Sequence, residues 1–174
     1  MRSLIEWVVI IAAALIVALV VKTFLLQAFY IPSGSMEPTL KPGDRVLVNK
    51  LSYDLHAIHR GDIVVFKRPP SEAGDPTIKD LIKRVIGLPG ERIEGRDGNV
   101  YINGAQIKEP YLPPGTVTTS MQPGGFVVPA GEYFVMGDNR SNSKDSRFIG
   151  PIPGNLIVGR AFVRVWPLSG LGLL

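Results

Sequence analysis

The chain has 174 residues, a formal net charge of +4 and no cysteine. This length suits one domain, or one domain with an anchor. The lack of cysteine excludes disulfides, a thiolate nucleophile and cysteine-based metal sites. The basic residues are scattered along the chain rather than clustered, so we expect no nucleic-acid partner.

The N-terminal region contains a long apolar segment. An unbroken run of 15 apolar residues covers 7–21, and its flanks extend it toward the length of about 20 residues that crosses a bilayer as a helix. Bulky residues follow the run and no small-x-small site does, which favours a retained signal-anchor over a cleavable signal peptide. We therefore predict a membrane anchor over residues 1–26.

The charges around this segment predict its orientation. Arg2 and the terminal amine precede the apolar run, and Lys22 follows it. The slight excess of positive charge before the run predicts a cytoplasmic N-terminus. We expect a single pass through the cell (plasma) membrane, with residues 27–174 forming a β-rich domain on the extracytoplasmic side.

From residue 27 onward, glycine and proline separate short runs that are rich in β-branched residues. Such runs predict strands at residues 45–50, 62–68, 81–88, 99–102, 132–136 and 156–165. Asp97-Gly98 and Asn103-Gly104 flank the fourth run, as in two tight hairpins, and loops are expected at 69–79 and 109–125. The predicted fold class is mainly β: an antiparallel, barrel-like or folded sheet domain with one N-terminal transmembrane helix.

Three segments carry the candidate chemistry: residues 31–40, 83–90 and 137–147. Ser35 lies in a Ser-Gly-Ser turn, and a nucleophilic serine needs a base to take its proton. The two histidines, His56 and His59, stand in a polar loop and are interpreted as solvated loop residues rather than a metal pair. We expect no metal and no cofactor.

Lys83 is the alternative base. A lysine is a base only when it is neutral, and burial lowers a lysine pKa by up to ~3–5 units. Strand alternation places Lys83 on the face of Leu81 and Val85, opposite Ile82 and Arg84. The residues alone equally allow an edge-strand lysine that prevents aggregation.

The third segment, residues 137–147, mixes acidic, basic and amide side chains. Its spacing does not fit an EF-hand, and three basic residues within it would repel a cation. The segment is better interpreted as a salt-bridged scaffold, or as a support for the base.

Taken together, these segments carry a family resemblance. Ile-Pro-Ser-Gly-Ser-Met-Glu-Pro-Thr-Leu, Lys-Arg-Val-Ile-Gly-Leu-Pro-Gly and Gly-Asp-Asn-Arg-Ser-Asn-Ser-Lys-Asp-Ser-Arg closely resemble, in order, the signature segments of bacterial type I signal peptidases (leader peptidases). These are serine proteases with a Ser/Lys dyad on a mostly antiparallel β fold. The resemblance extends from the predicted anchor to about residue 164. Glu91 departs from the aspartate that is usual in the family.

The resemblance implies a role for each matching residue. Ser35 would be the nucleophile and Lys83 the general base, while Ser143 would orient the lysine amine. Ser33 would donate to the oxyanion, together with the backbone N–H of Ser35. Further residues would support the site through ion pairs and hydrogen bonds: Arg84, Asp138, Asp145 and Arg147. Apolar side chains are expected beside the site or in shallow substrate pockets: Phe29, Ile31, Met36, Leu40 and Ile82.

The implied function is that of a membrane-bound serine endopeptidase. It would remove signal peptides from exported preproteins, cutting after small-x-small motifs through an acyl-enzyme. The expected partners are preproteins and the lipid bilayer, and the protein is expected to be a monomer. Two alternatives stay open at this point. One is a self-cleaving repressor of the Ser/Lys type, and the other is a membrane-tethered β module with an inactive site.

Overall fold

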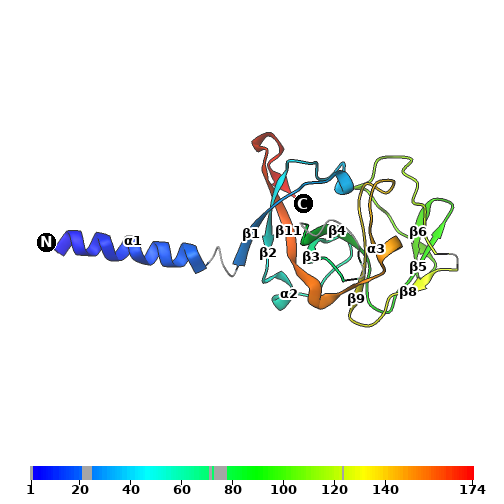
Figure 1. Ribbon diagram of the computed structural model, residues 1–174, viewed down its shortest axis with the longest axis horizontal. Helices are drawn as coiled ribbons and strands as arrows, with labels where there is room; N and C mark the ends of the chain where they lie inside the picture. The colour runs from blue at the N-terminus through cyan, green and yellow to red at the C-terminus, as the bar shows by residue number, and fades with distance from the viewer. Residues whose placement is uncertain (1, 21–24, 71, 73–77, 123) are drawn as a thin grey trace.

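The computed structural model describes residues 2–20, 25–70, 72, 78–122 and 124–174. An N-terminal helix, α1 (Arg2–Val20), precedes a domain built of β-strands (Figure 1). Within the described residues, no helix has both the length and the apolar character needed to cross a membrane. The predicted anchor, residues 1–26, also includes residue 1 and residues 21–24, which lie outside the described residues.

Two antiparallel sheets make up the β domain, which confirms the mainly β prediction. The larger sheet has the order β1 (Leu26–Tyr30), β2 (Arg45–Asn49), β11 (Ile157–Trp166), β3 (Ile63–Lys67), β4 (Asp80–Gly87), β9 (Glu132–Met136) and β10 (Ile152–Pro153), with β12 (Gly172–Leu173) paired to β11. The smaller sheet has the order β7 (Ala105–Gln106), β6 (Asn99–Ile102), β5 (Arg92–Arg96) and β8 (Phe126–Val127).

The six predicted strands all form, as β2, β3, β4, β6, β9 and β11. The strand β5 was not predicted, because its sequence of Arg, Ile, Glu, Gly and Arg has little β propensity. It becomes a strand by pairing along its length with β6. The short helical turns were also not predicted: α2 (Ser52–Leu55), α3 (Ser146–Ile149), η2 (Gly34–Met36), η3 (Gly154–Leu156) and η4 (Leu168–Gly170).

The two predicted hairpins are confirmed around β6. Asp97 and Gly98 have φ angles of 50° and 77°, and Asn103 and Gly104 have φ angles of 51° and 83°. A two-residue type I′ turn requires positive φ at both central positions, and Asp-Gly and Asn-Gly accept this best. These turns therefore join β5 to β6 and β6 to β7.

Buried apolar side chains hold the site-bearing segments in place. Ile31, Met36 and Leu40 of the 31–40 segment pack with residues of β2, β3, β4 and β11 in one core cluster. A second cluster joins β4 and β9 of the larger sheet to β5 and β6 of the smaller one. Full burial of such a side chain stabilises the fold by about 1.5–3 kcal/mol. The chain on both sides of Ser35 is thereby fixed against the sheet.

Candidate active site

Ser35 is the middle residue of the 3-10 turn η2. Ile31 before the turn and Leu40 after it are both buried in the core. The residue after Ser35, Met36, has no exposed surface, and Ser35 itself is 8% exposed. Because Met36 is buried in the core, the adjacent serine is held at the surface of the sheet in one orientation. The turn thus presents a hydroxyl group on a rigid support.

Lys83 comes from the middle of β4, and the four residues that follow it up to Gly87 are all buried. Lys83 is 4% exposed, and its Nζ lies 2.7 Å from Ser35 Oγ. The amine also donates to the carbonyl oxygen of Ile82 at 2.9 Å. Two residues far apart in sequence thus meet at hydrogen-bond distance.

Burial lowers the pKa of Lys83 to about 8, and the charges of Asp145, Glu72 and Asp138 act in the opposite direction. Desolvation disfavours the ammonium form, because the protein interior solvates a charge less well than water does. Within the described part of the chain, no carboxylate forms an ion pair with Lys83. The neutral amine is therefore far more populated near neutral pH than it is in an exposed lysine.

Two further predicted serines flank this pair. Ser33 is exposed, and its Oγ lies 3.5 Å from Ser35 Oγ. Ser143 is 8% exposed, and its Oγ has no hydrogen-bond partner among the described residues. The described residues show no hydrogen bond between the Lys83 amine and Ser143, and the amine donates to Ser35 and to Ile82. The role of Ser143 stays a prediction.

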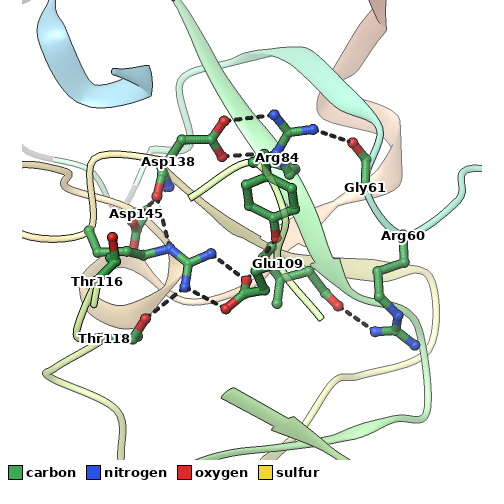
Figure 2. A network of polar contacts seen from close by, with 12 residues as sticks. Arg60, Gly61, Arg84, Glu109, Thr116, Thr118, Asp138 and Asp145 are labelled. Carbon is green, nitrogen blue, oxygen red and sulfur yellow. Dashed lines mark hydrogen bonds and ion pairs between the residues drawn. The ribbon is translucent and has the colours of Figure 1, made fainter. Parts of the chain in front are cut away.

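Arg84, the residue after Lys83, is buried with a carboxylate partner. Arg84 donates to both carboxylate oxygens of Asp138, at 2.9 and 2.6 Å, and to the carbonyl oxygen of Gly61 at 2.8 Å (Figure 2). Its guanidinium group stacks on the ring of Tyr111 at 4.0 Å. Thr39 Oγ1 donates to Asp138 at 2.6 Å. A carboxylate with such donors is held in one position, and it links the 31–40 segment to β4.

A second ion pair lies within the 137–147 segment itself. Arg147 donates to both carboxylate oxygens of Asp145, each at 2.8 Å. The same carboxylate caps α3 by accepting from the Arg147 N–H, and it accepts from the Gly137 N–H at 2.9 Å. This capping explains why a four-residue helix forms at Ser146, and it fixes the start of the segment beside β9.

Gly137 is where the 137–147 segment touches the serine turn. A Cβ built on Gly137 would lie 2.4 Å from the Ser35 carbonyl oxygen and 2.3 Å from Ser143 Oγ. No side chain fits at these distances, so glycine is needed for this close approach. Gly137 thereby allows Ser35 and Ser143 to come together.

The comparisons with known proteins agree with this arrangement. The family model for "Signal peptidase, peptidase S26" matches residues 4–166. The chain belongs to this family. It is a serine endopeptidase of the signal-peptide-processing class, which resolves the two alternatives left open by the residues alone.

Several relatives are similar over nearly the whole chain. A probable signal peptidase I-2 from Synechocystis sp. is 44% identical over 161 residues, covering 92% of this chain and 72% of the relative. A signal peptidase I from Leptolyngbya laminosa is 45% identical over 177 residues, covering 98% and 84%. Signal peptidase IB from Staphylococcus aureus is 37% identical over 183 residues, covering 97% and 92%.

One solved structure is also similar in sequence. The crystal structure of a signal peptidase I from Enterococcus faecalis is 33% identical, covers 60% of this chain and 97% of that chain, and has a TM-score of 0.47.

The predicted pocket residues of this signal peptidase family member lie mostly in the core. Ile31, Met36, Leu40 and Ile82 belong to one buried cluster, and only Phe29 of the predicted set is partly exposed. In this structure the buried four present little surface to a ligand. Their assignment to substrate pockets stays a prediction, and the partial exposure of Phe29 fits it best.

Sequence analysis missed the residues that tie the loop 109–125 to the site. Arg140 pairs with Glu109 at 2.5 and 3.1 Å and donates to Thr118 at 2.7 Å. Tyr111, whose ring stacks on Arg84, donates its hydroxyl to Glu109 at 2.7 Å. Nothing in a Pro- and Gly-rich loop signals such partners, because they become neighbours only in the folded chain.

Asn139 was also missed, although it lies inside a motif that was singled out. Its side-chain amide donates to the Gly34 carbonyl at 3.0 Å, and its backbone N–H donates to the Ser35 carbonyl at 3.1 Å. Asn139 therefore fixes the backbone of the serine turn directly. An amide in a loop between two supporting aspartates was the available signal.

No metal site is evident among the residues that the structure describes, since no group of three or more His, Asp or Glu side chains converges there. His56 and His59 are exposed in the loop that follows α2. The departure at Glu91 has a structural role, because its carboxylate accepts from the Leu88 N–H at 2.7 Å and pairs with Arg60 at 2.6 Å.

Proposed function

We propose that the chain removes signal peptides by Ser/Lys dyad catalysis, with Ser35 as the nucleophile and Lys83 as the general base. The observation that carries this proposal is the 2.7 Å contact between Lys83 Nζ and Ser35 Oγ, made by a lysine whose pKa burial lowers to about 8. A nucleophile and a base within hydrogen-bond reach are what acyl transfer requires.

The first half-reaction forms the acyl-enzyme. Neutral Lys83 accepts the proton of Ser35 as Oγ attacks the scissile carbonyl carbon, and the carbonyl electrons move onto oxygen. The Ser35 N–H and the Ser33 hydroxyl stabilise this oxyanion, and loss of one such donor costs about 10²–10³ in turnover. The intermediate collapses, the C–N bond breaks, and the protonated Lys83 gives its proton to the departing amine of the mature chain.

The second half-reaction releases the signal peptide. Lys83, neutral again, takes a proton from a water molecule that attacks the Ser35 ester. The ester bond breaks and Ser35 recovers its proton from Lys83. Ser143 is buried beside Gly137, and its hydroxyl has no partner within the described part of the chain. It orients the amine during these transfers. Arg84, Asp138, Asp145 and Arg147 hold the surrounding backbone in place.

Strand pairing supports an extended substrate. β3 pairs with β4 over Asp80 to Arg84, whereas β9 pairs with β4 from Arg84 onward. Residues 80–83 are therefore paired on one side within the described part of the sheet. A peptide strand added at this edge would be hydrogen-bonded by β4 and would pass Lys83 and Ser35.

We further propose that residues 1–26 anchor the protein in the cell membrane, with the N-terminus in the cytoplasm and the β domain outside as a monomer. The apolar run of residues 7–21 supports this. Four apolar side chains near the C-terminus are also exposed and suit contact with lipid: Trp166, Leu168, Leu171 and Leu173. A site near the membrane surface would meet signal peptides where they emerge.

The test is cleavage of a preprotein with an Ala-x-Ala site, in detergent, by the wild type and by Ser35→Ala. Ser169→Ala, at an exposed serine, is the matched control. Cleavage at the motif by the wild type and the control, with none by Ser35→Ala, supports the proposal. Equal cleavage by all three proteins would place the nucleophile elsewhere, and no cleavage by the folded wild type would remove the proposed activity.

A further inference from the structure

An open pocket of about 550 Å³ lies next to the serine turn, and the proposed mechanism does not use it. One wall is Glu37 and Pro38, which lie two and three residues after Ser35 in sequence. A second wall is formed by Asn139 and Ser141, and loop residues 113 and 115–117 form the third. Because Asn139 bonds the carbonyls of Gly34 and Ser35, the pocket borders the nucleophile.

Hydrogen bonds and an ion pair hold two of the pocket walls in place. Arg140 ties the second wall to Glu109 and Thr118 of the loop, and its side chain is 1% exposed. Thr116 Oγ1 donates to the Pro113 carbonyl at 2.7 Å within the third wall. The pocket is therefore a fixed feature beside the site.

Glu37 supplies the net charge of the pocket. The other ionised groups in the lining, Asp138 and Arg140, are almost fully buried and are paired with Arg84 and Glu109. Glu37 is partly exposed, and no ion pair with it is formed by the described residues. Its carboxylate folds over Gly34, since a Cβ on Gly34 would lie 3.2 Å from Glu37 Oε2.

The path of the substrate determines what reaches this pocket. The free edge of β4 begins at Asp80, which lines another hollow together with Gln27 and Phe29 of β1, close to the end of the chain that carries the predicted anchor. A signal peptide held in the membrane would enter there and run along residues 80–83. Beyond Lys83 the edge is occupied by β9 and by the segment that follows it, which forms the second wall of the pocket.

We propose that this pocket is the binding site for the first residues of the mature chain, and that Glu37 disfavours acidic residues and favours basic residues there. This proposal rests on the proposed function. A partly exposed charge pair contributes about 0.2–1 kcal/mol, or up to roughly fivefold in kcat/KM. The preference is weakened by salt, because the pocket is open to solvent.

The experiment uses the full chain in detergent and three preproteins that differ only at the second and third mature residues, which are both Asp, both Ser or both Lys. Each is cleaved by the wild type, Glu37→Gln and Glu37→Lys. Glu132→Lys, at a partly exposed glutamate outside the pocket lining, is the matched control. The ratio of kcat/KM for the Lys and Asp substrates is measured at low and high salt.

The wild type and the control are expected to favour the Lys substrate over the Asp substrate by up to roughly fivefold. Glu37→Gln brings the ratio toward one, and Glu37→Lys inverts it. A ratio near one in the wild type, or a ratio that both Glu37 variants leave unchanged, overturns the proposal while the proposed function stands. Failure of the wild type to cleave any of the three substrates removes the proposed function and this subsite with it.

Discussion

Two neighbouring basic residues on β4 are both buried, but only one of them has a carboxylate partner among the described residues. Lys83 and Arg84 are both buried, at 4% and 7% exposure. Arg84 has a bidentate carboxylate, a carbonyl acceptor and an aromatic ring around it. Lys83 has one hydroxyl and one carbonyl acceptor, and its pKa is lowered by burial.

The difference separates a structural charge from a reactive one. The charge of Arg84 is balanced in the interior by Asp138, and such a pair is costly to break. Burial makes Lys83 lose its proton more easily, and in the proposed mechanism this gives a base that operates near neutral pH. Alternation along the strand lets both environments exist within one residue of each other, because adjacent side chains point to opposite faces.

The largest effect is expected on the reactive side of this comparison. Lys83→Met removes the base while keeping an unbranched side chain of similar length, so kcat/KM should fall by about 10²–10⁴. Thermal unfolding should not occur at a lower temperature, since a buried amine is removed without leaving a charged partner. Lys108→Met, at an exposed lysine, is the control. A Lys83→Met enzyme with near wild-type kcat/KM would contradict the role of Lys83.

A smaller change in activity, but a larger one in stability, is expected on the structural side. Asp138→Asn leaves Arg84 buried without its charge partner, which should lower the free energy of unfolding by about 3 kcal/mol. Asp97→Asn, in the turn before β6, is the matched control, because asparagine also accepts positive φ there. Denaturant unfolding measures both. Equal midpoints for the two variants would show that the Arg84–Asp138 pair does not stabilise the fold.

The pH dependence sharpens the comparison further. The folded-state pKa of Lys83 is lowered to about 8 from an ordinary value of 10.5. Catalysis needs the neutral amine, so kcat/KM should rise about tenfold per pH unit below 8 and level off above it. Between these two pKa values the unfolded chain binds the extra proton, so the stability of the wild type should rise with pH relative to Lys83→Met.

Rate profiles and denaturant midpoints, measured from pH 6 to 10, test both statements. A rate that is already level at pH 6 would contradict a base with this pKa. A constant difference in stability between the wild type and Lys83→Met across the range would show that folding does not shift the proton affinity of Lys83.

Local sequence signals predicted much of the fold. The strand at 45–50 formed almost where its run of β-branched residues predicted it, because its side chains alternate against a core. The strand at 132–136 also formed as predicted, with its last three residues all buried. The Asp-Gly and Asn-Gly turns formed as predicted, since their conformations depend on two residues alone. The charged strand β5 could not be predicted, because its conformation comes from its partner β6.

The sequence also predicted only part of the candidate site. Motif order identified Ser35, Lys83, Asp138 and Arg147 as belonging together, and the structure brings these residues into one region. The contact between Glu109 and Arg140 was invisible in the sequence. Each partner is an ordinary loop residue until the two sheets pack and place them together.

By itself, the sequence determined the residue types, the turns and the short strands, because these depend on local propensity and on side-chain alternation. The tertiary structure decided which charges are balanced. The protonation of Lys83 depends on its removal from water by the packed chain, and the charge of Arg84 is balanced by a carboxylate 54 residues away. Desolvation and pairing are properties of the packed chain, so the lowered pKa of Lys83 exists only after folding.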